Sequence, residues 1–167
     1  MNYTANPDAI TREYFDSLLL ETRYIDSVLP TTKMALFGEE FDTPIMTAAL
    51  SHLDKTAPNG MGVYAQGAKL SNAVHWMGMG EDEELERVVA TGARTIKIIK
   101  PHADNKEVFR KIEHAVANGC FAVGMDTDHA FNSEGGYDNV MGLPMTSKSS
   151  AEIAEFVQAA GVPFIVK

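Results

Sequence analysis

The chain has 167 residues, of which 45% are hydrophobic and 22% charged, a balance typical of a globular domain with a core of its own. Its formal net charge is -9, which disfavours non-specific binding to nucleic acids and to anionic membranes. A phosphorylated small molecule is still compatible with this charge, because it needs only a local basic group and a few backbone N–H donors.

The cysteine content and the N-terminus bear on location. Cys120 is the single cysteine, so the chain has no internal disulfide and no cysteine-cluster metal site. That content favours a reducing compartment, and we expect a cytoplasmic protein. Residues 1–6 lack the basic region and apolar core of a signal peptide, and no apolar run approaches the ~20 residues of a membrane span. We therefore expect no membrane association.

The first 70 residues predict a lead-in segment followed by the first repeating unit. Apolar residues at helical spacing predict a helix over residues 9–24. Residues 33–41 contain a Gly-Glu-Glu turn between short apolar runs and predict a hairpin or an extended arm. Residues 44–49 read as the first buried strand, and residues 59–70 as a helix that three glycines weaken.

The rest of the chain alternates apolar runs with helical segments. Acidic residues at 81–84 open one helix, where the helix dipole favours them. Asp104 is expected to cap a second helix, with Gly119 just past its end, and Ser149 or Ser150 a third. A polar, glycine-rich loop is expected over residues 127–147. The expected strands are residues 73–77, 95–100, 121–125 and 161–167, and the expected helices are residues 81–92, 104–118 and 149–160.

This order, β-α-β-α-β-α-β-α-β, predicts an α/β fold with a parallel sheet and right-handed crossovers. Two architectures fit the order. Five strands can complete an open, doubly wound sheet of the flavodoxin type. A (β/α)₈ barrel needs about 250 residues, so the chain would then form only its N-terminal half.

Charged residues near the carboxyl ends of the predicted strands are candidates for chemistry, because ligands of parallel sheets bind there. Lys97 lies inside an apolar strand, where an ammonium is costly unless it is paired or faces a ligand. Lys100 and Lys167 end their strands and could stabilise negative charge or simply be solvated. Asp126 could orient a base, hold a hydroxyl group or serve as a turn cap.

Several common sites are not indicated. The five histidines show no HExxH or similar spacing, so no metal site is predicted; His129 alone lies beside acidic residues. Neither GxGxxG nor GxxxxGKS is present. The segment Gly78-Met79-Gly80 is too short to count as a nucleotide-binding loop.

Three segments resemble the FMN-dependent α-hydroxy-acid dehydrogenases and oxidases, the group of glycolate oxidase, lactate oxidase and flavocytochrome b2. They are Pro44-Ile45-Met46-Thr47-Ala48, Met125-Asp126-Thr127-Asp128 and Gly161-Val162-Pro163-Phe164-Ile165-Val166-Lys167, of which the last is the most specific. The likeness spans about residues 24–167. It implies a TIM barrel of which residues 44–167 form strands 1 to 5, preceded by a helix and arm at residues 1–43.

The resemblance also implies a flavin-binding set. Thr47 and Ala48 match a first-strand segment whose backbone faces the flavin. Gly78 stands about where the family has a serine near flavin N5, and Lys97 where it usually has a flavin-binding glutamine. Lys167 matches a lysine that contacts the flavin N1–O2 edge and stabilises the negative charge of the reduced ring.

Other positions concern the substrate. Asp126 matches the aspartate that holds the catalytic histidine, so Asp126 and Lys167 are the expected catalytic residues. Ile99 replaces the usual third-strand tyrosine. The arginine that grips the substrate carboxylate has no equivalent in the loop at residues 127–133. The pattern is most similar to a divergent bacterial branch of the family.

The resemblance thus implies part of an FMN-dependent oxidoreductase that converts an α-hydroxy acid to a 2-oxo acid. Because the family's catalytic histidine follows the fifth strand, we expect the 167-residue chain alone to be inactive. Its exposed sheet edges predict a homo-oligomer or pairing with a C-terminal half. The alternatives are a non-catalytic half-barrel, or a flavodoxin-like domain, that binds a phosphorylated ligand or a protein partner.

Overall fold

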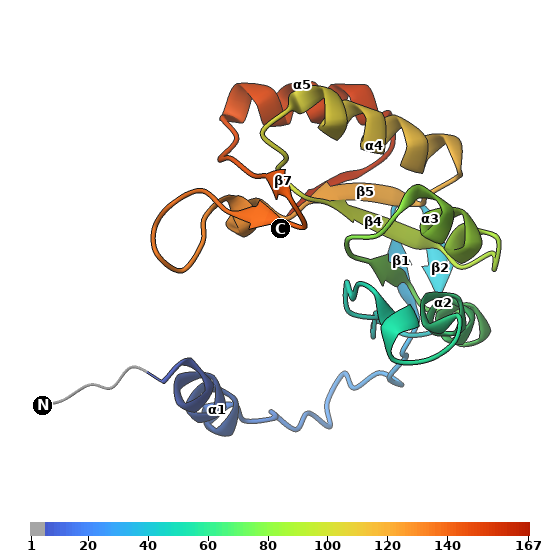
Figure 1. Ribbon diagram of the computed structural model, residues 1–167. Helices are drawn as coiled ribbons and strands as arrows, with labels where there is room; N and C mark the ends of the chain where they lie inside the picture. Colours follow the sequence, from blue (N-terminus) through green and yellow to red (C-terminus); the bar gives the residue numbers. More distant parts are fainter. Residues whose placement is uncertain (1–5) are drawn as a thin grey trace, which may run out of the picture. The chain divides into compact units, whose positions relative to one another are not determined.

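The computed structural model describes residues 6–167 (Figure 1), which divide into two compact units. The first ends at Thr31 and the second runs from Thr32 to Lys167. Among the described residues, no helix has both the length and the apolar character needed to cross a bilayer.

In the described part of the first unit, residues 6–31, there is one helix, α1 (Pro7–Ser17). Asn6 caps it, because the Asn6 side chain accepts a hydrogen bond from the Asp8 N–H, and proline occupies the first turn, where no N–H is needed. The helix is shorter than the predicted range of residues 9–24. It ends where Leu18 adopts an extended conformation, while the Ser17 hydroxyl donates to the carbonyl of Tyr14.

The second unit is built on a parallel sheet of four strands, β3 (His75–Met77), β4 (Thr95–Ile99), β5 (Ala122–Met125) and β8 (Phe164–Val166), in that order. Helices connect them: α3 (Asp82–Val89), α4 (Asn105–Ala117) and α5 (Ser150–Ala160), with α2 (Gly60–Leu70) before β3. The prediction of parallel β/α units is confirmed. The spatial order of these strands follows the chain without the reversal that defines a doubly wound sheet, which favours the barrel.

The segment at residues 44–49 is not the regular strand that was predicted. It is extended and runs beside β3, where the N–H of Thr47 donates to Val74 and Leu50 forms an isolated parallel bridge with Met77. The Thr47 hydroxyl accepts the hydrogen bond of the Trp76 N–H. A side chain thus takes the place of a main-chain carbonyl in the ladder, which interrupts the regular pairing.

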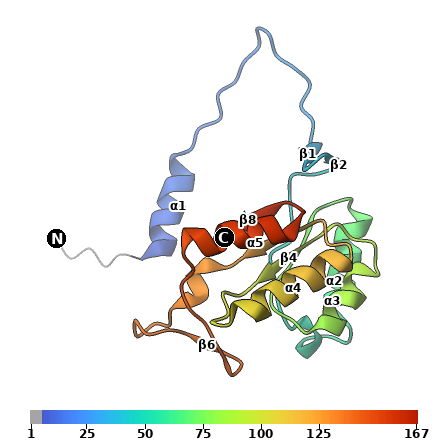
Figure 2. The same cartoon turned by 90° about the horizontal axis from the view of Figure 1, so that it is seen from above.

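The two faces of the sheet carry separate cores because side chains alternate along each strand. The helix-side core lies under α3, α4 and α5; α4 and α5 lie side by side over β4 and β5 (Figures 1 and 2). The hairpin-side core lies on the opposite face. The helix-side core includes Met77, Leu85, Val88, Ile99, Val108, Ile112, Val123, Met125 and Phe156. The hairpin-side core comprises Phe41, Val74, Ile96, Ile98 and Ala122, with Trp76 and Ile165 packed against it.

Two hairpins flank the sheet. β1 (Met34–Leu36) and β2 (Glu39–Phe41) form the predicted hairpin, and its buried Phe41 packs edge-on against Phe121 at 5.6 Å between ring centroids. Residues 127–147 were predicted as a loop. They contain a short 3₁₀ helix, η2 (Thr127–Ala130), and a hairpin of β6 (Asn139–Val140) and β7 (Leu143–Pro144). A further 3₁₀ turn, η1 (Leu53–Lys55), precedes α2.

The helix ends follow the predicted capping residues. Asp104 caps α4, and Ser149 caps α5 in a reciprocal capping box with Glu152. Gly119 and Gly161 follow these two helices with positive φ angles, where glycine carries no steric penalty. Gly161 therefore ends α5 cleanly and directs the chain into β8.

Candidate active site at the carboxyl ends of the strands

A row of charged side chains follows the last residues of three neighbouring strands. β4, β5 and β8 pair in register up to their carboxyl ends. The next residues along the chain are Lys100, Asp126 and Lys167. Since side chains alternate, all three belong to the face of the sheet that carries the hairpin-side core. We call these three residues the charged row.

The charged row is held together by two short ion pairs. Lys100 Nζ lies 2.6 Å from Asp126 Oδ2, and Lys167 Nζ lies 2.7 Å from Asp126 Oδ1. The side chains of Asp126 and Lys100 are 8% and 11% exposed, whereas that of Lys167 is 48% exposed. Main-chain bonds fix the row, because Lys167 donates its N–H to Met125 and its carbonyl accepts the N–H of Thr127.

These contacts set the protonation states. Burial alone would raise the pKa of Asp126, but hydrogen bonds from Lys100 and Lys167 outweigh it and hold that pKa well below its usual range. The hydrogen bond to Asp126 raises the pKa of Lys167. At neutral pH the row therefore contains an anionic Asp126, and Lys167 is protonated.

The structure places Lys97 apart from the charged row. Its ammonium donates to the carbonyl of Gly78 at 2.5 Å, and alternation assigns the side chain to the helix-side face. Burial, with a contribution from Lys111 of α4, lowers the pKa of Lys97 to about 8. A contact between Lys97 and a cofactor stays a prediction.

Thr47 and Ala48 already use their polar groups within the protein. The Thr47 hydroxyl binds the N–H of Trp76 at 2.7 Å, and the Ala48 N–H donates to the Tyr64 hydroxyl at 2.9 Å. At Gly78 a Cβ atom would come within 2.4 Å of Ser51 Oγ, so glycine is needed there for the packing of residues 49–51. The roles predicted for these three positions in cofactor binding stay predictions.

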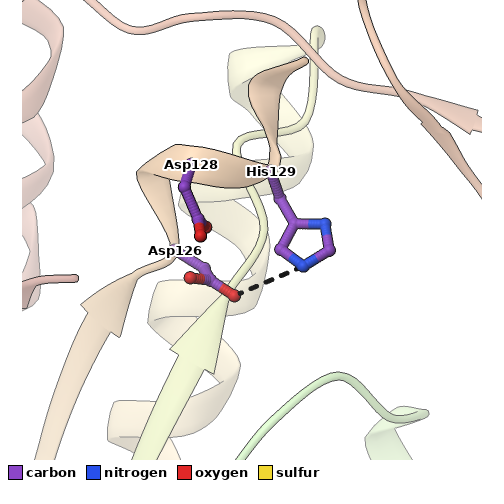
Figure 3. A group of neighbouring side chains, drawn as sticks. All are labelled: Asp126, Asp128 and His129. Carbon is purple, nitrogen blue, oxygen red and sulfur yellow. Dashed lines mark ion pairs between the residues drawn. The ribbon is translucent and has the colours of Figure 1, made fainter. Parts of the chain in front are cut away.

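A second group follows β5 at the start of η2. Figure 3 shows Asp126, Asp128 and His129 close together, with His129 Nε2 3.9 Å from Asp126 Oδ2. Both oxygens of Asp126 already accept hydrogen bonds from ammonium groups, so a cation would have to compete with two lysines. Asp128 and His129 are exposed, and we assign no metal to this group.

His75 lies beneath the first-strand segment and is fully buried. Its Nδ1 lies 3.1 Å from Thr47 Oγ1, and its Nε2 has no hydrogen-bond partner within residues 6–167. Burial lowers the pKa of His75 to about 4. A charged imidazolium here would carry an unsatisfied N–H, so His75 is neutral in the folded protein.

We expect this histidine to make stability depend on pH. The folded-state pKa is depressed from 6.5 to about 4, so the unfolded state binds more protons between these values. The free energy of unfolding should therefore fall as the pH is lowered from 6.5 towards 4, and less steeply in His75→Gln. Urea denaturation across this range measures the slope, and NMR titration of the imidazole gives its pKa. A His75 ring that titrates near 6.5 would contradict the assignment.

Sequence reasoning left Lys100 open between a ligand role and a solvated strand end. The structure shows that its side chain is only 11% exposed and is paired with Asp126. Side-chain alternation along β4 does place Lys100 on the same face of the sheet as Ile98. The sequence alone does not show which face of the sheet that is.

Comparisons with known proteins identify a family and a fold. Residues 7–165 match the family described as FMN-dependent dehydrogenase. No curated protein matches the chain.

Among solved structures, a mandelate oxidase variant with (S)-mandelic acid is 15% identical, with a TM-score of 0.79 over 95% of this chain and 51% of the other. Mandelate oxidase with 3,3-difluoro-2-hydroxy-3-phenylpropionic acid gives the same values. A variant with a monooxide FMN adduct is 16% identical, with a TM-score of 0.69 over 81% and 43% of the two chains. The chain thus spans about half the length of these oxidases, and its fold is that of half their barrel.

Proposed function

The chain belongs to the family of FMN-dependent dehydrogenases, and from this premise we propose that it is the N-terminal half of an enzyme that oxidises an α-hydroxy acid to a 2-oxo acid. The expected family resemblance is confirmed by the match over residues 7–165. We propose residues 44–167 as the half-barrel and residues 1–43 as its preceding helix and arm. The observation that carries the proposal is the charged row at the carboxyl ends of β4, β5 and β8.

The chemistry of this row suits a flavin. FMN, when bound, accepts the two electrons that leave the substrate carbon. An ammonium beside the N1–O2 edge of the ring stabilises the negative charge that arises there. Lys167 supports this role because its side chain is about half exposed while its charge is fixed by Asp126. The further residues proposed to hold the cofactor are Thr47, Ala48, Gly78 and Lys97.

Asp126 is proposed as the residue that orients a histidine base. The substrate gives up one proton from its hydroxyl group and one hydrogen with two electrons from its α-carbon. A base must take the first proton, and an anionic carboxylate stabilises a base that becomes positively charged. Asp126 is buried and anionic, which supports this role.

Location and assembly complete the proposal. We propose a cytoplasmic protein that acts on a small-molecule α-hydroxy acid. β8 ends the sheet on one side, and no strand within residues 6–167 pairs with its outer edge. An exposed edge favours association, so we propose a homo-oligomer or pairing with a C-terminal half.

We expect FMN to bind the protein with a loss of flavin fluorescence, and Lys167→Met to weaken that binding about tenfold, because one charge-assisted hydrogen bond is lost. Lys106→Met, which changes an exposed lysine of α4, is the matched control and should bind FMN like the wild type. Fluorescence titration gives both affinities. The 167-residue chain alone should not oxidise lactate, glycolate or mandelate.

Two results would count against the proposal. Absence of FMN binding by the wild type would contradict the proposed flavin-dependent function. Equal FMN affinity in Lys167→Met and the wild type would remove the role of Lys167, even if the cofactor binds.

A further inference from the structure

The charged row contains more positive than negative charge. Two ammonium groups, of Lys100 and Lys167, share the single carboxylate of Asp126. Asp128 and His129 are the other ionisable groups next to that carboxylate, and both are exposed, where water screens their charges. Asp126 is therefore shared between the two lysines and is the exclusive counter-ion of neither.

The two lysines are not equivalent. They bind opposite oxygens of Asp126, so their ammonium groups lie on either side of it, Lys100 towards β4 and Lys167 towards β8. Lys100 is the more buried, at 11% exposed against 48%. An ammonium has three N–H donors, and among the described residues Asp126 is the one hydrogen-bond acceptor recorded for Lys100. A largely buried cation that shares its counter-ion and has donors to spare favours an anion beside it.

The loop that follows Asp126 offers no further cation for such an anion. Residues 127–147, which follow Asp126 and extend beyond the row, contain neither lysine nor arginine. Lys97 lies on the helix-side face, where its ammonium is bound to Gly78. Lys100 is therefore the group on the β4 side of the row that can pair with an incoming anion.

We propose that Lys100 binds the carboxylate group of the α-hydroxy-acid substrate. This inference rests on the proposed function. In that function Lys167 contacts the cofactor, and an anionic substrate binds at the same edge of the sheet. Lys100 and the substrate carboxylate form an ion pair, and Asp126 holds the ammonium in place from the other side. Lys100 is thus a substrate-binding residue that selects acids over neutral alcohols or amides.

The test uses oxalate, a small dicarboxylate that is not an α-hydroxy acid, and its neutral diamide, oxamide. Isothermal titration calorimetry measures their binding to the protein with and without FMN, so the readout needs neither turnover nor a flavin signal. We expect oxalate to bind the wild type and the FMN-loaded form at least tenfold more tightly than oxamide. Lys100→Gln should weaken oxalate binding at least tenfold without changing the affinity for FMN, and Lys100→Arg should restore it to within a few-fold. Lys148→Gln, which changes a lysine bound to His102 and Asn105, is the control.

The outcomes separate the inference from the proposed function. If oxalate binds Lys100→Gln as tightly as the wild type, or if it does not bind the wild type at all, the inference is wrong whether or not FMN binds. If the wild type binds oxalate through Lys100 but does not bind FMN, the anion site stands and the flavin function fails. Circular dichroism reports whether Lys100→Gln folds. If it does not fold, two other measurements test the inference: oxalate binding by Lys100→Arg, and the affinities of the wild type for oxalate and oxamide. Equal affinity of the wild type for the two probes would overturn the inference.

Discussion

We expect Asp126→Asn to lower the free energy of unfolding by about 3 kcal/mol at neutral pH, the lower end of the cost of breaking a buried ion pair. The substitution keeps the shape of the side chain but leaves Lys100, which is 11% exposed, without its counter-ion. Lys167 adds less to the loss because water can solvate its half-exposed side chain. Urea denaturation at pH 7 measures the difference from the wild type.

The same substitution should remove a pH dependence. The folded-state pKa of Asp126 is held below its ordinary value of 3.8, so its stabilising effect is complete above that value and is lost as the pH falls below it. The wild type should lose this part of its stability below about pH 4, and Asp126→Asn should not. The exposed neighbour Asp128 provides the control, because Asp128→Asn should change stability by less than about 0.5 kcal/mol. A loss of similar size in both variants would show that the ion pairs of Asp126 are not its cause.

The second large effect concerns the packing that positions β8. We expect Phe156→Ala to lower the free energy of unfolding by about 3–5 kcal/mol, because it removes a fully buried ring and leaves a cavity. Phe156 lies on α5 and packs edge-on against Phe109 of α4, with ring centroids 5.0 Å apart. Since α5 leads directly into β8, amide hydrogen exchange should show the largest loss of protection in α5 and β8.

Val157 is the matched control for this prediction. It follows Phe156 on the same helix but is 46% exposed, so Val157→Ala should cost less than about 1 kcal/mol. A cost below about 1 kcal/mol for Phe156→Ala would mean that α5 contributes little to holding β8 and Lys167 in place.

Local signals in the sequence were sufficient for most of the fold. The capping residues Asp104 and Ser149 marked the starts of two helices, and Gly119 marked the end of the first. The apolar runs before Asp126 and Lys167 marked their strands. These signals depend on neighbours in the chain, and for that reason they could be read without the structure.

The exceptions arise where a distant contact decides the conformation. The segment at residues 44–49 has the composition of a buried strand, but its pairing depends on how the Thr47 hydroxyl meets β3. The hairpin of β6 and β7 is not predicted from the sequence, because its strands have only two residues each. Two residues are too few to show the alternation of apolar and polar side chains that identifies a strand.

The sequence by itself determined the α/β class, the family and two members of the charged row, Asp126 and Lys167, because each follows from local composition or from a recognisable segment. Only the tertiary structure brought Lys100 into the charged row and placed Lys97 on the other face of the sheet. Every residue of β4 is buried on one face or the other, so the strand has no polar side from which to read its orientation. Helices pack on one face of the sheet and the β1–β2 hairpin packs on the other. As a result Lys97 binds the carbonyl of Gly78, and Lys100 binds Asp126.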